Sequence, residues 1–386
     1  MIVFVSQTSL WASHTQVRTN LQHAYRDQLG NKFDVVIKKV PVSGLEKSFW
    51  MRLVEQSFRS LDRVHLVCLD GGLPYQTTTT WGQWMNPKTT VFHFHVWSDV
   101  MIRQAEFIDA LLQLEGFKGA LHVCSRPMQR LLEAWLGGAS YHQHMIPLSA
   151  VHFEPLRQRR PTPGLKRVSF VGRINVDKGL DTLLTWWRTT TLDCELQLFG
   201  APSYENELSW EPETFMQRQR ELESSLNTCG IAHRKLKSTR EVAAKLQASD
   251  GAVSCSTFMY EEFGIAVAEA IAAGCPVIVS DWGGHQTLAK APGVFTVPVR
   301  CSPFPSVNPR DLEKVMRRVF SMNQIELEAL RVANRKWARQ HLSNVAVGKG
   351  LAKSLNHIDS FPRPSRGHFF SPRDVITAFG QGRSSA

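Results

Sequence analysis

Two cationic side chains stand five residues apart in the stretch SFVGRINVDKGLDTLL, residues 169–184. An apolar run ends at Gly172, Arg173 and Lys178 follow on a predicted loop, and Gly179 leads into a predicted helix. Two cations on a strand-to-helix loop can bind a diphosphate, helped by the free N–H groups at the start of the helix. The alternative is a solvated loop that carries an Arg and a Lys, which is common in any basic protein.

A carboxylate also lies inside an otherwise apolar stretch, YEEFGIAVAEAIAAGCPVIVS, residues 260–280. Residues 264–273 are predicted to form a short helix that ends at Gly274, which places Glu269 in the middle of that helix. Because an unpaired buried carboxylate is costly, a buried Glu269 needs a partner, and a ribose diol is one candidate. The alternative is that Glu269 faces water.

The elements that must position these side chains alternate between short β-branched runs and longer helical patterns. Strands are predicted at 2–6, 34–38, 64–70, 90–95 and 120–125 in the first half, and at 167–172, 195–200, 251–255, 276–280 and 293–297 in the second. Helical patterns occupy 15–29, 46–60, 98–115 and 127–136. Such alternation predicts an α/β protein with two doubly wound, Rossmann-like units. Ligands of open parallel sheets bind at the carboxyl ends of the strands, so we expect the chemistry in a cleft that the two units face.

Composition divides the chain into regions. Residues 157–167, RQRRPTPGLKR, hold two prolines, one glycine, five basic residues and no acidic residue, which is typical of a linker. The expected regions are an N-terminal domain at 1–156, a linker at 157–166, a C-terminal domain at 167–342, a helix at 343–358 and a mobile tail at 359–386.

Three motifs occur in a fixed order in the second half. They are G-R-x4-K-G at Gly172 to Gly179, E-x7-E with F-G inside it at Glu261 to Glu269, and AIAAGCPVIVSDWGG at residues 270–284. In this order and spacing they resemble the C-terminal domain of the GT-B glycosyltransferases, specifically the large retaining family 4. The resemblance extends over about residues 165–340 and is loose in the N-terminal half.

The resemblance implies a GT-B fold, with an N-terminal acceptor domain and a C-terminal nucleotide-sugar domain. It implies a retaining, metal-independent transferase that moves a hexose-type sugar from a UDP- or GDP-linked donor to a hydroxyl acceptor. It further implies an acceptor that is a saccharide or is lipid-linked, as in polysaccharide, lipopolysaccharide or glycolipid assembly. The helix at 343–358 would cross back to the N-terminal domain, as it does in the family.

The resemblance also assigns residue roles. Arg173 and Lys178 hold the donor diphosphate, Glu269 binds the ribose, and Glu261 contacts the transferred sugar. The implied donor-binding residues are Gly172, Arg173, Lys178, Glu261, Phe263, Gly264, Ile265 and Glu269, and the implied catalytic residues are His95, Arg173, Lys178 and Glu261. Electrostatic stabilisation of the leaving diphosphate by the two cations would carry most of the catalysis, with no metal or other cofactor required.

His95 enters this set through the stretch TVFHFHVWSD, residues 90–99. It resembles the family's strand that ends in a histidine facing the donor sugar across the cleft. His93 lies on the same face of the strand, because side chains alternate, but deeper. The alternative for either residue is a packed core histidine.

The chain departs from the family pattern in two places. The stretch SQTSLWASH, residues 6–14, has no glycine where many members carry a glycine pair, and Thr287 stands where a glutamate is frequent. Both departures bear on the acceptor and on the sugar, and neither changes the diphosphate-binding motif.

Composition sets further limits. Charged residues are 20% and hydrophobic residues 43% of the 386, which suits a soluble globular protein, and the net charge of +11 favours partners that carry phosphate. The seven cysteines form no CxxC pair, which indicates a reducing compartment and no metal cluster. No basic residue opens the chain as in a secretory signal, and we therefore expect a cytoplasmic protein. Basic stretches beside Trp50, Trp81 and Trp84 are candidate contacts with an anionic membrane at its inner face.

Other function classes remain open from the sequence. A catalytically silent nucleotide-sugar-binding protein would carry the same motifs, whereas a sugar-nucleotide epimerase of the same architecture fits the E-x7-E motif less well. Nucleic acid is not an expected partner, since the cations are dispersed and no RNA-binding signature occurs.

Overall fold

The computed structural model divides the chain into two compact units. Unit 1 comprises Met1–Pro147 and Asn344–Ser371, and unit 2 comprises Leu148–Ser343 and Pro372–Ala386. The structure describes residues 2–7, 12–29, 35–40, 64–69, 88–97, 116, 118–136, 141–148, 166–204, 209–229, 231, 233–236, 238–356, 359–360 and 371–380.

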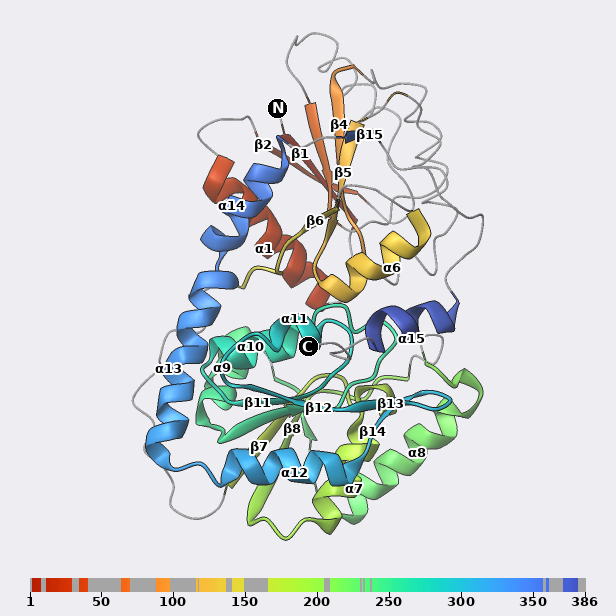
Figure 1. Cartoon of the computed structure of the whole chain (residues 1–386), viewed down its shortest axis with the longest axis vertical. Coiled ribbons are helices and arrows are strands. Elements are labelled where there is room, and N and C mark those ends of the chain that lie inside the picture. Colours follow the sequence, from red (N-terminus) through yellow and green to blue (C-terminus); the bar gives the residue numbers. More distant parts are fainter. Residues whose placement is uncertain are drawn as a thin grey trace. The chain divides into compact units, whose positions relative to one another are not determined.

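Unit 1 is built on a seven-stranded sheet in the order β15-β5-β4-β3-β1-β2, with β6 beside β5 (Figure 1). Its strands are β1 (Ile2–Gln7), β2 (Val35–Val40), β3 (Val64–Cys68), β4 (Thr90–His95), β5 (Lys118–Val123), β6 (Tyr141–Gln143) and β15 (Asp359–Ser360). All pairs are parallel except that of β15 with β5. Every residue of β3 and β4 is buried, as expected for central strands of a parallel sheet covered on both faces.

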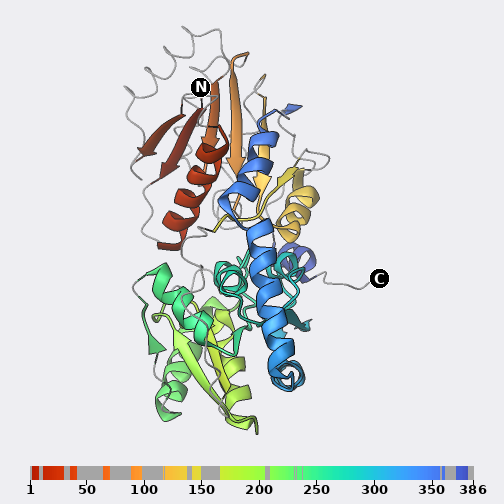
Figure 2. The same ribbon diagram turned by 90° about the vertical axis from the view of Figure 1, so that its left-hand side faces the viewer.

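The described helices of unit 1 are α1 (Ala12–Leu29), α6 (Arg126–Leu136) and α14 (Asn344–Ser354). Figure 2 shows α14 running alongside α1, although more than 300 residues separate them in the sequence. The contact is close because Gly348 has no side chain: a Cβ atom there would lie 2.2 Å from the carbonyl oxygen of Ala24. Helix α14, from the second segment of unit 1, is therefore packed against α1 from the first.

Unit 2 has a six-stranded sheet in the order β12-β11-β10-β7-β8-β9, and all its pairs are parallel. The strands are β7 (Lys166–Val171), β8 (Cys194–Phe199), β9 (His233–Arg234), β10 (Gly251–Ser254), β11 (Val277–Ser280) and β12 (Val294–Val297). A separate hairpin pairs β13 (Val299–Cys301) with β14 (Pro305–Val307). From β7 the chain builds outward to β8 and β9, and it then returns to build on the other side of β7 with β10. The direction of building therefore changes between the neighbouring strands β7 and β10. This is the topological switch point of a doubly wound sheet, and such folds bind ligands beyond the carboxyl ends of the strands there.

The described helices of unit 2 are α7 (Leu180–Thr189), α8 (Pro212–Thr228), α9 (Thr239–Ala248), α10 (Ile265–Ala272), α11 (His285–Leu288), α12 (Pro309–Phe320), α13 (Gln324–His341) and α15 (Pro372–Gly380). A short 3-10 turn, η2 (Val176–Lys178), precedes α7. Strand and helix side chains meet in a core that includes Phe170, Trp186, Leu198, Phe215 and Met316, all almost fully buried.

The sheets follow the strand predictions closely in both halves, and the mixed α/β class with doubly wound parallel sheets is confirmed. The helices expected at 46–60 and 98–115, the linker up to residue 165, and Trp50, Trp81 and Trp84 lie outside the described residues. Four of the nine residues of the glycine-free stretch 6–14, residues 8–11, lie outside them as well. Within the part of the chain that is described, no helix has the length and apolar character needed to cross a bilayer.

The C-terminal residues differ from the expectation of a mobile tail. Residues 372–380 form α15, which buries Val375, Ala378 and Phe379. The ring of Phe379 packs edge-to-face on Trp282, with 5.9 Å between the ring centroids. The segment is rich in Ser, Pro, Gly and Arg, which is why a mobile tail was predicted. Its few apolar residues are spaced for one face of a short helix, and that helix packs against Trp282.

Candidate functional site

The loop after β7 is fixed by backbone and side-chain hydrogen bonds. Asn175 caps the 3-10 turn, since its Oδ1 accepts the N–H of Lys178 at 3.2 Å. Gly179 then adopts a left-handed conformation with φ of +70°, and a Cβ atom there would lie 2.2 Å from the carbonyl oxygen of Cys255. Only glycine fits this position, which joins the loop after β7 to the end of β10.

Glu261 lies in the loop after β10, and hydrogen bonds hold both its side chain and its backbone. Ser256 Oγ donates to Glu261 Oε2 at 2.5 Å and itself accepts the N–H of Phe258 at 3.3 Å. The carbonyl oxygen of Glu261 accepts the N–H of Gly284 at 2.6 Å. The carboxylate is therefore held by the fold itself.

The two loops bring three of the sequence-predicted residues together. Lys178 Nζ lies 2.7 Å from Glu261 Oε2, and the two side chains are only 17% and 10% exposed. The Arg173 guanidinium carbon and Lys178 Nζ lie 4.7 Å and 4.5 Å from the centroid of the Phe258 ring, within the range of cation–π contacts. Arg173, Lys178 and Glu261 thus form one cluster at the switch point between β7 and β10, which we call the cation cluster.

The electrostatics keep the Glu261 carboxylate ionised at neutral pH. Burial alone would raise the pKa of Glu261, but the charges of Lys178 and His285 and the hydrogen bonds from Lys178 and Ser256 lower it to about 2. Burial lowers the pKa of Lys178 and Arg173 lowers it further, while Glu261 opposes both effects. A negative ligand would add to the forces that keep Lys178 protonated.

The start of α10 lies next to the cation cluster. Gly264 precedes the helix with φ of +85°, and no side chain of the described residues caps it. The first N–H groups of a helix have no acceptor within the helix, and they favour anions. Phe263 is buried just before this start and Ile265 is half-buried at it. The predicted residues Phe263, Gly264 and Ile265 therefore lie where the backbone can contribute N–H donors.

Glu269 lies one turn further along α10 and is 6% exposed. The alternative that Glu269 faces water is therefore wrong. Its role as a ribose ligand stays a prediction.

Some residues near the cation cluster were missed at the level of sequence. His285 packs its ring edge against Gly264, where a Cβ atom would lie 2.7 Å from His285 Cδ2, and its Nδ1 lies 3.0 Å from Ser280 Oγ. Asp177 is buried in the loop after β7 and accepts a hydrogen bond from Ser209 at 2.9 Å. The sequence signal for His285 is its place directly after the Gly-Gly pair; Asp177 lies inside the G-R-x4-K-G motif, at a position that the motif leaves open.

His95 is not part of the cation cluster. It lies in unit 1 at the last position of β4, none of its side chain is exposed, and its Nε2 lies 3.1 Å from the hydroxyl of Tyr25. Contact with a donor sugar, as the resemblance implies, would require the ring to become exposed. His93, the deeper candidate, is equally buried.

Comparisons with known proteins support the fold. Residues 165–312 match the family model described as Glycosyl transferases group 1. A comparison with curated proteins found no match. Among solved structures, Alr3699/HepE of Anabaena in complex with UDP is 13% identical with a TM-score of 0.64, and the match covers 92% of this chain and 99% of that one.

Two further solved structures are similar over the same extent. The N-terminal domain of trehalose-6-phosphate phosphatase from Candida albicans is 12% identical with a TM-score of 0.60, covering 92% of this chain and 98% of that one. The apo form of the lipopolysaccharide outer core galactosyltransferase WaaB is 14% identical with a TM-score of 0.58, covering 92% and 99%. The chain therefore has the GT-B fold of two Rossmann-like units. The match to group 1 glycosyltransferases lies within unit 2, the unit that carries the cation cluster.

Proposed function

We propose that the protein is a glycosyltransferase that uses a nucleoside diphosphate sugar, UDP- or GDP-linked, as donor. It transfers a hexose-type sugar, with retention and without a metal at the donor site, to a hydroxyl of a saccharide or lipid-linked acceptor. The observation that carries the proposal is the cation cluster. Arg173 and Lys178 converge beside Glu261 at the switch point of a doubly wound sheet, next to the uncapped start of α10.

The cation cluster suits a diphosphate for electrostatic reasons. Arg173 and Lys178 both contact the ring of Phe258, and the charge of Arg173 lowers the pKa of Lys178, so the two positive charges are close enough to repel each other. A diphosphate placed against them relieves that repulsion and also meets the N–H groups that begin α10. As the bond to the sugar breaks, negative charge grows on the diphosphate, and fixed cations in a partly buried site stabilise it most effectively at that moment.

The two glutamates take different roles in this proposal. Because the pKa of Glu261 is about 2, its side chain is a carboxylate at neutral pH, which accepts hydrogen bonds from sugar hydroxyls and has no proton to give as a general acid. Glu269 accepts the ribose hydroxyls. The leaving diphosphate would assist deprotonation of the acceptor, as the family resemblance implies.

A thermal-shift screen tests the donor class. UDP, UDP-glucose, GDP and GDP-mannose are added in turn to the full chain, and the melting temperature is measured. A ligand at one hundred times its dissociation constant adds about 2.7 kcal/mol to the unfolding free energy, which corresponds to a rise of about 5–10 °C for a unit of this size. No rise with any of the four would remove the proposal.

Single variants locate the binding site. Arg173→Ala, Lys178→Ala and Glu269→Ala should each abolish or strongly reduce the rise in melting temperature and the turnover. The matched controls Arg188→Ala and Lys290→Ala remove exposed cations of the same unit and should leave the rise intact. Normal donor binding in both the Arg173 and the Lys178 variants would show that the diphosphate site is misassigned.

Donor turnover separates a transferase from a catalytically silent binding protein. The transferase releases nucleoside diphosphate when an acceptor is added, whereas the silent protein shows the thermal shift without release. An epimerase would instead convert the donor without any acceptor.

A further inference from the structure

Unit 1 contains a second group of chemically active side chains, far from the motifs of unit 2 in sequence. His65 on β3, His93 and His95 on β4, His122 on β5 and His144 just after β6 are all buried, with at most 9% of any of them exposed. His95 and His122 are register partners on neighbouring parallel strands, which directs their side chains to the same face of the sheet. Their ring centroids lie 4.8 Å apart, and that of His144 lies 4.8 Å from His95.

Three of these histidines have one ring nitrogen held and the other left over. His95 Nε2 lies 3.1 Å from the Tyr25 hydroxyl, and His122 Nε2 lies 3.2 Å from His93 Nδ1. His144 Nδ1 donates to the carbonyl oxygen of Met145 at 2.8 Å. Their remaining nitrogens, His95 Nδ1, His122 Nδ1 and His144 Nε2, are buried and have no hydrogen-bond partner among the described residues.

This pattern is that of metal-binding histidines, in which one nitrogen binds the ion and the other is oriented by a hydrogen bond. The carbonyl of Met145 can only accept, so the proton of a neutral His144 is on Nδ1 and the lone pair of Nε2 is bare. The contact of His93 Nε2 with His65 Nδ1 at 3.1 Å allows a one-way chain, in which His122 donates to His93 and His93 to His65. In that chain the lone pair of His122 Nδ1 is bare as well.

Burial disfavours the charged form of these three histidines. Burial, and then the neighbouring histidines, lower the pKa of His95 and His122 well below 6.5. Burial also lowers the pKa of His144, to about 4. Buried nitrogen lone pairs without a partner are costly, and one cation can satisfy several of them at once.

We propose that His95, His122 and His144 bind a divalent transition-metal ion, for which Zn²⁺ is the best match. Each side chain offers one ligand atom, and these atoms lie within 4.8 Å of one another. Nitrogen ligands of a tetrahedral zinc lie about 3.3 Å apart, so rotations of the side chains, including a tilt of the stacked rings of His95 and His122, bring them into place. Three imidazoles suit zinc and its neighbours in the transition series, whereas magnesium and calcium prefer oxygen ligands.

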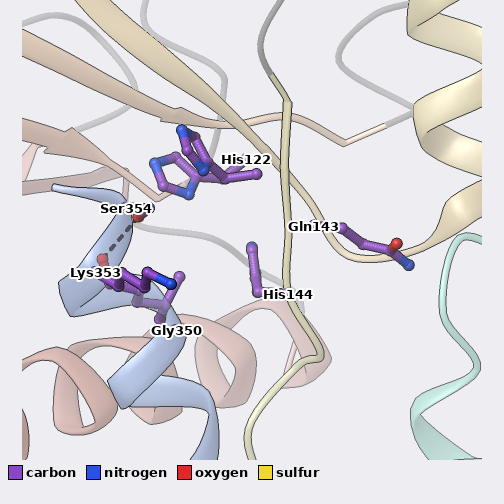
Figure 3. A pocket seen from close by; sticks show the side chains of 8 residues that line it. His122, Gln143, His144, Gly350, Lys353 and Ser354 are labelled. Atoms are coloured by element: carbon purple, nitrogen blue, oxygen red, sulfur yellow. Dashed lines mark hydrogen bonds between the residues drawn. The ribbon is translucent and has the colours of Figure 1, made fainter. Parts of the chain in front are cut away.

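A pocket adjoins two of the three proposed ligands. A pocket of about 340 Å³ is lined by His122 and His144 on one side and by Gly350, Lys353 and Ser354 of α14 on the other (Figure 3). His95 is not among the lining residues, so it would be the innermost ligand. A site with three protein ligands and an opening is the arrangement of zinc sites that keep a water molecule as the fourth ligand. The sequence predicted no metal site anywhere in the chain, and the proposed ion of unit 1 departs from that expectation.

Metal titration of the full chain tests the proposal. The protein is stripped with a chelator, and Zn²⁺ is added in a calorimeter while Co²⁺ is added in a parallel visible-absorption experiment. The expected result is one equivalent of Zn²⁺ per chain, a higher melting temperature, and the intense cobalt bands of tetrahedral coordination. Binding of less than one tenth of an equivalent, or a cobalt spectrum of octahedral type, would overturn the proposal.

Variants assign the ligands. His144→Gln and His122→Gln should each weaken Zn²⁺ binding at least tenfold, because each removes a ligand. The control His23→Gln changes an exposed histidine on α1 of the same unit and should bind as the wild type does. His144 lies outside the strands, so its variant is expected to fold, which circular dichroism checks. Equal binding in all three variants would place the metal elsewhere and contradict the assignment.

Discussion

Removing the Lys178 ammonium is the most informative perturbation of the cation cluster. In the variant Lys178→Met the Glu261 carboxylate, 7% exposed, keeps Ser256 and loses its nearest cation. The pKa of Glu261 is about 2 in the folded protein against an ordinary value of 4.5, which corresponds to about 3 kcal/mol of stability at neutral pH. Truncating one partner of a buried pair typically costs about 3–5 kcal/mol. We therefore expect a loss of about 3 kcal/mol, seen as a fall of about 6–12 °C in the melting temperature.

The pH dependence follows from the direction of the shift. A carboxyl group whose folded pKa is lowered stabilises the protein above its unfolded pKa and loses that contribution as the pH falls toward the folded pKa. The gap between wild type and Lys178→Met should thus be full at pH 7 and should close as the pH falls from about 4.5 toward 2. Differential scanning calorimetry at several pH values measures it.

Two further variants make the result specific. Lys178→Met combined with Glu261→Gln removes the isolated charge and should recover most of the loss. Lys314→Met breaks the exposed pair with Asp311 and should cost no more than about 1 kcal/mol. If Lys178→Met melts as the wild type does, or if the double variant is no better than the single one, the reasoning about this buried pair fails.

Three other variants probe the fold around the site. Burial raises the pKa of Asp177 to about 6, so ionisation of this carboxyl group destabilises the folded protein at higher pH. The variant Asp177→Asn should therefore be more stable than wild type by about 3 kcal/mol at pH 7.5 and equal to it near pH 4. A difference that calorimetry finds unchanged across that pH range would contradict this. Gly264→Ala should destabilise by about 1–3 kcal/mol, because its φ is +85° and the new methyl group would meet His285 at 2.7 Å, whereas Gly350→Ala has nothing within 4 Å and should not destabilise; equal melting temperatures would show that the strain is absent. Phe379→Ala should cost about 3–5 kcal/mol in urea unfolding, since the ring is fully buried, and a loss below 1 kcal/mol would mean that α15 is not docked in solution.

Local signals predicted the sheets well. Runs such as 90–95 and 167–172 combine β-branched or aromatic residues with clear ends, and they became β4 and β7 with shifts of one residue at most. The motif G-R-x4-K-G and the residue Glu261 were found because their chemistry is encoded within a few positions. The 2.7 Å contact between Lys178 and Glu261, which are 83 residues apart, is consistent with the predicted alternation of strands and helices. That alternation alone did not predict the contact.

Tertiary contacts account for what the sequence did not predict. Ser256 and His285 act on Glu261 only because three loops converge, and neither has a local signature. The histidines of unit 1 show the same limit: the alternation of His93 and His95 was visible, but the approach of His122 depends on the register of β5 beside β4. Packing of the whole sheet sets that register, so no single stretch of sequence predicts it.

The division of unit 1 into two sequence segments has a consequence for biosynthesis. Its first helix, α1, lies against α14, and the 196 residues from Leu148 to Ser343 are made between the two segments. At about 5–20 residues per second, a ribosome needs about 10–40 s to cover that distance. During this interval the face of α1 around Ala24 lacks α14, its partner in the folded unit, so a nascent chain must complete most of unit 2 before unit 1 can reach its final state.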